Sequence, residues 1–158
     1  MREILFRGKR KDNGEWVEGS LILTTSAKEK TYIVDSCYCY DGCIDEDGYA
    51  DFDRLNAFEV IPETAGQYTG LTDKNGKKIF EGDIVHAVYS NGYIGVPDTD
   101  YGNLIVGFDD TYYGGACYSM KIVGDTGYRI FSAGLINGVT VIGNTHDNPE
   151  LLKEGDGE

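Results

Sequence analysis

The feature that most constrains the fold is the stretch of residues 68–85, in which two short arms flank Asn75-Gly76. Asn and Gly both tolerate positive φ, so this dipeptide predicts a two-residue type I′ turn and a β-hairpin around it. That turn would place Asp73 opposite Lys78, an oppositely charged pair across the ladder. The stretch therefore predicts a β fold, and it carries no catalytic motif.

A second copy of this pattern opens the chain. Residues 1–23 predict another hairpin, with Asn13-Gly14 in its turn. Similar residues recur at corresponding places in the two halves of the chain, namely residues 18–22 with 81–85 and residues 58–63 with 139–144. We therefore infer an internal duplication.

The composition favours strands. The chain has 22 Gly, 3 Pro and 12 Tyr, which is typical of many short strands joined by tight turns. We predict an all-β fold of two related small modules, an N-terminal one at 1–66 and a C-terminal one at 67–158 with its tail. The early hairpin and evenly spaced turns make at least the second module similar to an SH3-like barrel, by analogy of fold. Asn148-Pro149-Glu150 predicts a short C-terminal helix with Pro at its first position.

The same residues carry a family resemblance. Residues 60–85 are similar to the signature of the YopX family of phage and prophage proteins. Residues 4–19 resemble the opening of that family and residues 141–152 its end, whereas residues 86–138 match only loosely. The resemblance implies a β-rich fold and a phage-encoded origin. It supplies no activity, cofactor or catalytic residue.

The charge of the chain is strongly negative and uneven. Its 27 acidic and 14 basic residues give a net charge of −13. Two windows, residues 35–53 and 79–120, hold carboxylates and no Lys or Arg. Such acidity keeps a protein soluble, and it also offers a face for a basic partner. Basic residues gather at the start of the chain, at Arg2, Arg7, Lys9, Arg10 and Lys11.

Tyrosines lie in or beside the acidic windows. An exposed Tyr gives a large contact area at low entropic cost, as protein interfaces favour. We therefore predict a surface that binds a basic protein partner or a second copy of this chain. The candidate residues of this surface are Tyr38, Tyr40, Asp45, Asp47, Tyr112 and Tyr113.

The cysteines give no metal signature. Cys37, Cys39 and Cys43 lack the Cys-x2-Cys spacing of common zinc ribbons, and Cys117 is far along the chain. We expect no metal and four reduced thiols. A calcium-binding loop starting at Cys43 would end at Arg54, where that motif needs Asp and a bidentate Glu, so calcium is not expected either.

No catalytic constellation is present. His86 lies in an apolar strand and His146 beside the start of the predicted helix, so both suit structural roles. The chain has no nucleophile–base pattern and no phosphate-binding glycine motif, so we predict that it is not an enzyme and needs no cofactor. A hydrolase with convergent carboxylates is the least favoured alternative.

The favoured function is that of a non-catalytic phage or prophage accessory protein that binds another protein, or itself, in the bacterial cytoplasm. No run approaches 18 apolar residues and the N-terminus has no apolar export segment, so we expect neither membrane insertion nor export. The alternative is a nucleic-acid-associated protein that uses the basic strand at residues 2–11. Strand alternation sends those charges to both faces, so we expect no tight binding of nucleic acid by the protein alone.

Overall fold

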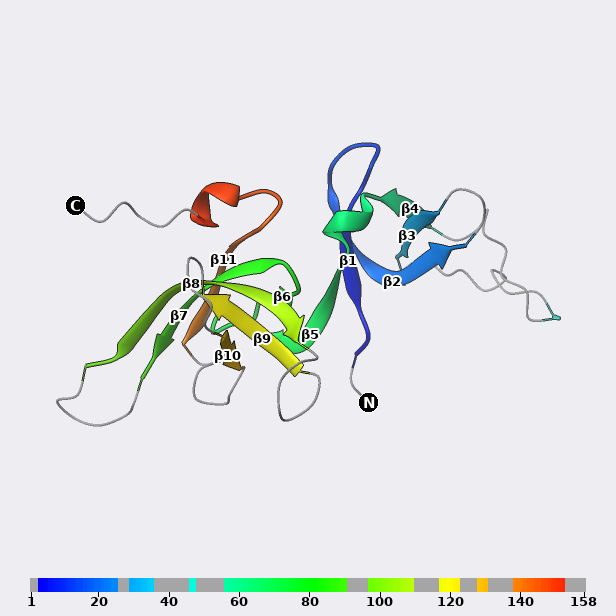
Figure 1. Cartoon of the computed structure of the whole chain (residues 1–158). Helices are drawn as coiled ribbons and strands as arrows, with labels where there is room; N and C mark the ends of the chain where they lie inside the picture. Colours follow the sequence, from blue (N-terminus) through cyan, green and yellow to red (C-terminus); the bar gives the residue numbers. More distant parts are fainter. Residues whose placement is uncertain are drawn as a thin grey trace. The chain divides into compact units, whose positions relative to one another are not determined.

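A computed structural model describes residues 3–25, 29–35, 46–47, 56–90, 97–109, 117–122, 128–130 and 138–152. Within these ranges the chain consists of β-strands joined by turns, with two short 3-10 helices, η2 (Pro62–Thr64) and η3 (Pro149–Leu152) (Figure 1). The predicted all-β fold is confirmed. At the predicted C-terminal helix the structure has only the single 3-10 turn of η3.

The chain divides into two compact units, Met1–Tyr68 and Thr69–Glu158. Its strands form two antiparallel sheets, in the orders β4-β3-β2-β1-β5-β6 and β10-β9-β8-β7-β11. Strand β5 (Gly66–Thr72) crosses the boundary between the units. Its first residues pair with β1 in the first unit, and its remainder lies in the second.

The first unit is built on an antiparallel meander. Its strands are β1 (Phe6–Lys9), β2 (Trp16–Thr24), β3 (Lys30–Val34) and β4 (Ala57–Val60). Phe6 pairs with Gly19 and Lys9 with Trp16, which confirms the predicted N-terminal hairpin. The end of β4 also pairs with the residue that follows β1, through an isolated antiparallel bridge between Arg10 and Val60.

The second unit holds the larger described core. Besides β5, its strands are β6 (Lys78–Phe80), β7 (Asp83–Tyr89), β8 (Thr99–Asp109), β9 (Cys117–Ile122), β10 (Tyr128–Ile130) and β11 (Val139–Asn144). Alternate residues of the paired strands point to the same face, so their apolar side chains meet in one layer. The buried cluster consists of Ile79, Val85, Ala87, Leu104, Val106, Met120, Val139 and Val141.

The turn of the central hairpin differs from the predicted one. The Asp73 N–H donates to the Lys77 carbonyl and the Gly76 N–H to the Asp73 carbonyl, so the loop has three residues and Asp73 lies opposite Lys77 instead of Lys78. Gly76 takes a φ of 81°, whereas no described residue other than glycine has positive φ. The type I′ prediction is wrong because the Asp73 carboxylate accepts the N–H groups of Asn75 and Lys77, and this local bonding favours a turn closed by Gly76 alone.

Each unit contains a similar hydrogen bond that closes it. The Lys11 N–H donates to the Glu59 carbonyl at 2.9 Å in the first unit, and the Lys74 N–H donates to the Val139 carbonyl at 3.1 Å in the second. In each unit, therefore, the residue that enters the hairpin loop bonds to a later strand, β4 or β11. This likeness agrees with an internal duplication, which stays a prediction, as does the SH3-like character of the second module.

Candidate functional site

Most of the predicted partner surface falls outside the described ranges. Tyr38, Tyr40, Asp45, Tyr112 and Tyr113 all lie there, as do Cys37, Cys39 and Cys43. Asp47 is described and exposed, and Cys117 is the first residue of β9. A surface built from the two acidic windows therefore stays a prediction.

Two carboxylates of the central stretch, Asp73 and Asp83, are buried and bonded to the backbone. Asp73 is 5% exposed and Asp83 is 1% exposed. Asp73 accepts the backbone N–H groups of Asn75 at 2.8 Å, Lys77 at 2.9 Å and Val141 at 3.1 Å. Asp83 accepts the N–H of Phe80 at 2.8 Å across the turn between β6 and β7. Asp73 and Asp83, which are buried and bonded to the backbone in this way, therefore hold the turns of this stretch.

The electrostatics of Asp73 agree with this role. Burial raises the pKa of Asp73, but the N–H donors of Val141, Lys77 and Asn75 and the charge of Lys77 together outweigh it. The net pKa therefore lies below the usual value for Asp. Asp73 is ionised at neutral pH, and its charge strengthens the bonds that fix the hairpin to β11.

Parts of the signature-like stretch and of the segment that resembles the family's end meet in the second unit. The Thr145 N–H donates to the Gly82 carbonyl at 2.9 Å. Asn144 pairs with Asp83 in the ladder, and its side-chain oxygen accepts the N–H groups of His146 and Asp147. His146 thus takes part through its backbone in a turn that precedes η3. These bonds join the Gly82–Asp83 turn to the segment that precedes η3.

His86 lies in a small polar cluster on β7 and β8. Its Nε2 is 3.4 Å from an oxygen of Asp100, and its Nδ1 is 3.5 Å from the side-chain oxygen of Asn103. Asn103 also donates to the Leu151 carbonyl of η3 at 3.3 Å. Across the residues that the structure describes, no three His, Cys, Asp or Glu side chains gather in a group suited to a metal ion.

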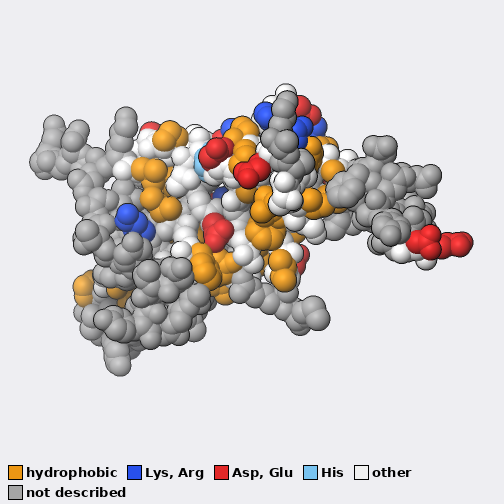
Figure 2. Space-filling model, turned by 45° about the vertical axis from the view of Figure 1, so that its right-hand side comes forward, with side chains coloured by type: hydrophobic (Ala, Val, Ile, Leu, Met, Phe, Trp, Pro, Cys, Tyr) orange, Lys and Arg blue, Asp and Glu red, His pale blue; other side chains and the backbone are white. Residues whose placement is uncertain are grey.

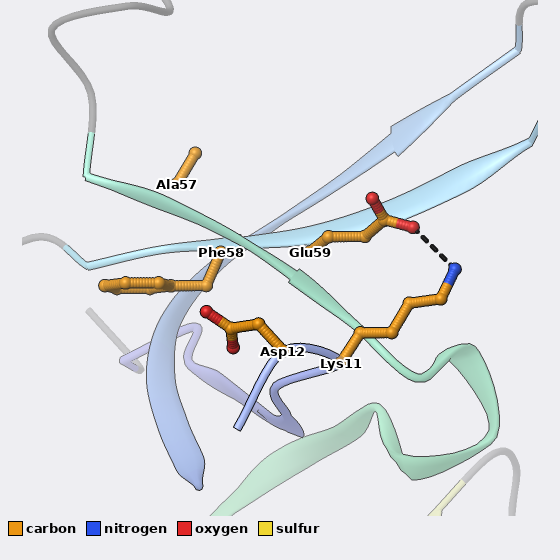
Figure 3. A pocket seen from close by; sticks show the side chains of 5 residues that line it. All are labelled: Lys11, Asp12, Ala57, Phe58 and Glu59. Carbon is orange, nitrogen blue, oxygen red and sulfur yellow. Dashed lines mark hydrogen bonds and ion pairs between the residues drawn. The ribbon is translucent and has the colours of Figure 1, made fainter. Parts of the chain in front are cut away.

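A groove of about 280 Å³ opens in the first unit between β4 and the loop of the β1–β2 hairpin. In Figure 3, Lys11 and Asp12 of the loop and Ala57, Phe58 and Glu59 of β4 line the groove, with Asp12 near Phe58 and Lys11 bonded to Glu59. Lys11 and Glu59 are 48 residues apart in the sequence. The return of β4 to the hairpin therefore creates this site, and sequence reasoning missed it.

The backbone of β4 is only partly paired along the groove. The Asp35 N–H donates to the Asn56 carbonyl, which fixes the alternation of the antiparallel ladder. The N–H and carbonyl groups of residues 56, 58 and 60 therefore point to β3, and those of residues 57, 59 and 61 point away from it. The hairpin uses the Glu59 carbonyl and the Ile61 N–H. Among the described residues nothing bonds to the Ala57 N–H and carbonyl or to the Glu59 N–H, because the hairpin turns away after Lys11.

The Phe58 side of the groove is aromatic and charged. The Arg10 guanidinium lies 4.2 Å from the centre of the Phe58 ring. Asp12 holds that guanidinium with two bonds of 2.9 and 2.6 Å, and Glu15 lies 3.8 Å from it. The hydrogen bond from Arg10 lowers the pKa of Asp12. This side of the groove is thus an aromatic face beside an ionised, exposed carboxylate.

The opposite side of the groove centres on Glu59. Its two carboxylate oxygens accept Lys11 Nζ at 2.8 Å and Lys30 Nζ at 2.9 Å. These bonds lower the pKa of Glu59, that from Lys11 first and that from Lys30 next. The groove therefore has an ionised carboxylate on each side of a partly unpaired strand edge. Such an edge can take up an extended segment of another chain.

The fold and these sites define an all-β protein of two antiparallel sheets with a partly open strand edge. No described helix has both the length and the apolar character needed to cross a membrane. The family model described as YopX protein matches residues 5–153, and the chain belongs to this family. A search of curated proteins found no match. The crystal structure of protein EF1440 from Enterococcus faecalis is similar, with 19% identity, a TM-score of 0.52, and coverage of 97% of this chain and 100% of that one. At this identity the likeness shows a shared fold.

Proposed function

We propose that this protein is a non-catalytic protein-binding module that takes an extended segment of its partner along the edge of β4. We propose further that it is a phage or prophage accessory protein acting in the cytoplasm of the bacterial host. The observation that carries the proposal is the groove beside Ala57, where the backbone of β4 has bonding groups that the rest of the described first unit does not use.

An open strand edge favours protein binding on physical grounds. A peptide that adds to such an edge gains backbone hydrogen bonds whatever its sequence, and its side chains then fill the neighbouring spaces. Here the small Ala57 leaves room on one side of the strand, while the ring of Phe58 offers apolar area on the other. A segment of about three residues fits the length of β4 that the hairpin leaves open.

The alternative functions have less support. Arg10 and Lys11 of the basic N-terminal strand are already held by Asp12 and Glu59, so a phosphate would have to displace carboxylates to reach them. Figure 2 shows Lys and Arg side chains intermixed with Asp and Glu at the top of the view, with no continuous basic stripe among the side chains that it colours. The buried signature carboxylates, bonded to backbone N–H groups, give no support to a hydrolase.

The test compares the capture of a partner by two variants of Ala57, of which only one lacks the backbone N–H. Ala57→Pro removes the outward N–H and leaves the bonds between β3 and β4 in place, while Ala57→Ser keeps that N–H. The immobilised wild-type protein and both variants are exposed to lysate of infected or lysogenic host cells, and bound proteins are identified by mass spectrometry. Circular dichroism and thermal unfolding check that each variant is folded.

We expect the wild type and Ala57→Ser to retain the same partner and Ala57→Pro to lose it. Equal retention by a folded Ala57→Pro variant would show that the partner binds elsewhere and would refute the proposed site. Retention of nucleic acid in place of protein would make the basic N-terminal strand the better candidate.

A further inference from the structure

We infer that the segment received by β4 is the C-terminus of the partner chain, which runs parallel to β4 and places its terminal carboxylate at the Glu59 N–H. This inference rests on the proposed function and names the part of the partner that binds. Three observations carry it, namely the position of the β1–β2 hairpin, the free backbone groups of the edge, and the charges around Glu59.

The hairpin blocks the edge of β4 at Glu59. Arg10 bridges Val60 in the antiparallel sense, so the next residue of the hairpin, Lys11, lies opposite Glu59. The bond of 2.9 Å from the Lys11 N–H to the Glu59 carbonyl agrees with this register. The chain then enters its turn and leaves open the part of β4 that precedes Glu59. An added strand therefore has room along that part but not opposite Glu59.

A parallel strand can bond to all three free groups of this edge within that room. The groups without a partner among the described residues are the Ala57 N–H and carbonyl and the Glu59 N–H. In a parallel pair, one residue donates to a carbonyl of the neighbouring strand and accepts from the N–H two positions further along. The residue opposite Phe58 would thus donate to the Ala57 carbonyl and accept the Glu59 N–H. The residue two positions earlier would accept the Ala57 N–H.

An antiparallel strand bonds less completely. It would exchange two hydrogen bonds with Ala57, but its bond to the Glu59 N–H would need a residue opposite Glu59, where Lys11 lies. Because the parallel strand gains the third bond without displacing the hairpin, the open edge favours the parallel direction.

The parallel direction makes the hairpin the end of the path. A strand parallel to β4 runs toward Glu59, and its residue opposite Phe58 is the last one with room before Lys11. A chain that ends there needs no turn, and its terminal carboxylate takes the place of a peptide carbonyl as the acceptor of the Glu59 N–H. Hydrogen bonds to an ionised acceptor are shorter and about twice as strong as those between neutral groups.

The charges around Glu59 suit a second carboxylate. Two ammonium groups, Lys11 Nζ at 2.8 Å and Lys30 Nζ at 2.9 Å, share the one carboxylate of Glu59 (Figure 3 shows the bond from Lys11). An ammonium has three donors, and each of these two gives one to Glu59. The Lys11 side chain is exposed, so it can turn another donor toward a carboxylate bound at the Glu59 N–H.

The last side chain of the segment would lie on the Phe58 side. Residues opposite one another in a sheet point to the same face, so this side chain would lie beside the Phe58 ring. Arg10 and Asp12 already neutralise each other there. An apolar last residue therefore suits the site.

Three short peptides titrated into the isotope-labelled full chain test the inference, with the amide resonances of Ala57 and Glu59 as the readout. The first is an acetylated tetrapeptide that alternates threonine with valine and ends in valine with a free carboxylate. The second has the same sequence and a C-terminal amide, and the third is extended by two glycines, so its carboxylate lies further along. The first should bind at least about fivefold more tightly than the others, because only it places a charge at the Glu59 N–H. Ala57→Pro should weaken its binding about fivefold, and Ala57→Ser should not.

Two charge-matched variants separate the local site from general attraction. Lys11→Met removes the ammonium and keeps an apolar stem, so it should weaken the free-carboxylate peptide about threefold or more and leave the amidated peptide unchanged. Lys74→Met removes the same charge at the corresponding residue of the second unit and should affect neither peptide. Equal weakening by the two variants would overturn the inference, because the peptide would then respond to net charge alone.

A nitroxide label in place of the acetyl group reports the direction of the bound peptide. In the parallel direction the label lies toward the start of β4, so it should broaden the amide resonance of Asn56 more than that of Lys11. Stronger broadening of Lys11 would show an antiparallel segment and contradict the inference.

The remaining outcomes distinguish the inference from the proposed function. If the three peptides bind equally and Ala57→Pro weakens all of them, the edge receives an internal segment and the C-terminal assignment is wrong. If none of them shifts the Ala57 and Glu59 amides at millimolar concentration, the inference also fails, whereas loss of the captured partner in Ala57→Pro would still support the proposed function. Equal capture by Ala57→Pro and the wild type refutes both. A dimer that Ala57→Pro dissociates would make a second copy of this chain the occupant and overturn the inference.

Discussion

Replacing Asp73 with Asn should lower the free energy of unfolding of the second unit by about 2 kcal/mol at pH 7. One oxygen of Asp73 accepts the N–H groups of Asn75 and Lys77, and the other accepts the N–H of Val141. An Asn side chain has a single oxygen, so its NH2 group would face either the two N–H groups of the turn or the N–H of Val141. If the oxygen stays in the turn, the buried Val141 N–H loses its acceptor.

The magnitude follows from the three donors. A buried donor left without a partner costs about 1–3 kcal/mol. The N–H groups of Asn75 and Lys77 belong to an exposed turn, where water can form hydrogen bonds to them. Loss of the negative charge weakens their bonds to residue 73, and this adds only a few tenths of a kcal/mol. A total near 2 kcal/mol results.

The pH dependence gives the sign of the effect. The pKa of Asp73 is lowered in the folded protein, so its contribution is present above the unfolded pKa of about 4 and is lost as the pH falls through the lower folded value. The difference between the wild type and Asp73→Asn should therefore be constant from pH 7 to about 5 and narrow below about 4.

Urea unfolding followed by far-ultraviolet circular dichroism at pH 7, 5 and 3 measures this difference. Taking the difference between two proteins removes the contributions of the other carboxylates, which both share. A gap below about 0.5 kcal/mol at pH 7, or one that is as large at pH 3, would refute the assignment of Asp73 as an ionised clamp on Val141.

Three further predictions concern packing and thiols. Gly19→Ala should destabilise the first unit by about 3 kcal/mol or more in urea unfolding, since its Cβ would lie 1.9 Å from the Val34 carbonyl oxygen, while Gly107→Ala, with nothing within 4 Å, should change stability by less than about 0.5 kcal/mol. Leu104→Ala should cost the second unit about 2–5 kcal/mol in the same assay. All four cysteines should react with a thiol reagent under denaturing, non-reducing conditions, and two or fewer would indicate a disulfide.

Local sequence signals predicted the hairpins because those signals act between near neighbours. Asn13-Gly14 and Asn75-Gly76 each lie in the loop of an observed hairpin, and Gly14 and Gly76 take positive φ. The turn type at Asn75-Gly76 was beyond sequence reasoning. It depends on Asp73, whose carboxylate both bonds within the loop and reaches Val141, 68 residues away.

The candidate site was hidden for a related reason. Phe58 and Glu59 show an ordinary strand pattern, and Asp12 belongs to an ordinary turn. Only the return of β4 to the hairpin, through the bridge of Arg10 with Val60, sets them across a groove. The tyrosine-rich surface predicted from composition contributes a single described residue, Asp47, so nothing in the fold bears on it.

Amide hydrogen exchange at β4 tests the central claim most directly. In the free protein the amides of Ala57 and Glu59, which face away from β3, should exchange quickly, while those of Phe58 and Val60, which face β3, exchange slowly. A saturating partner should slow exchange at Ala57 and Glu59. Equal protection of all four amides in the free protein, or unchanged exchange at Ala57 and Glu59 in the saturated complex, would contradict the account.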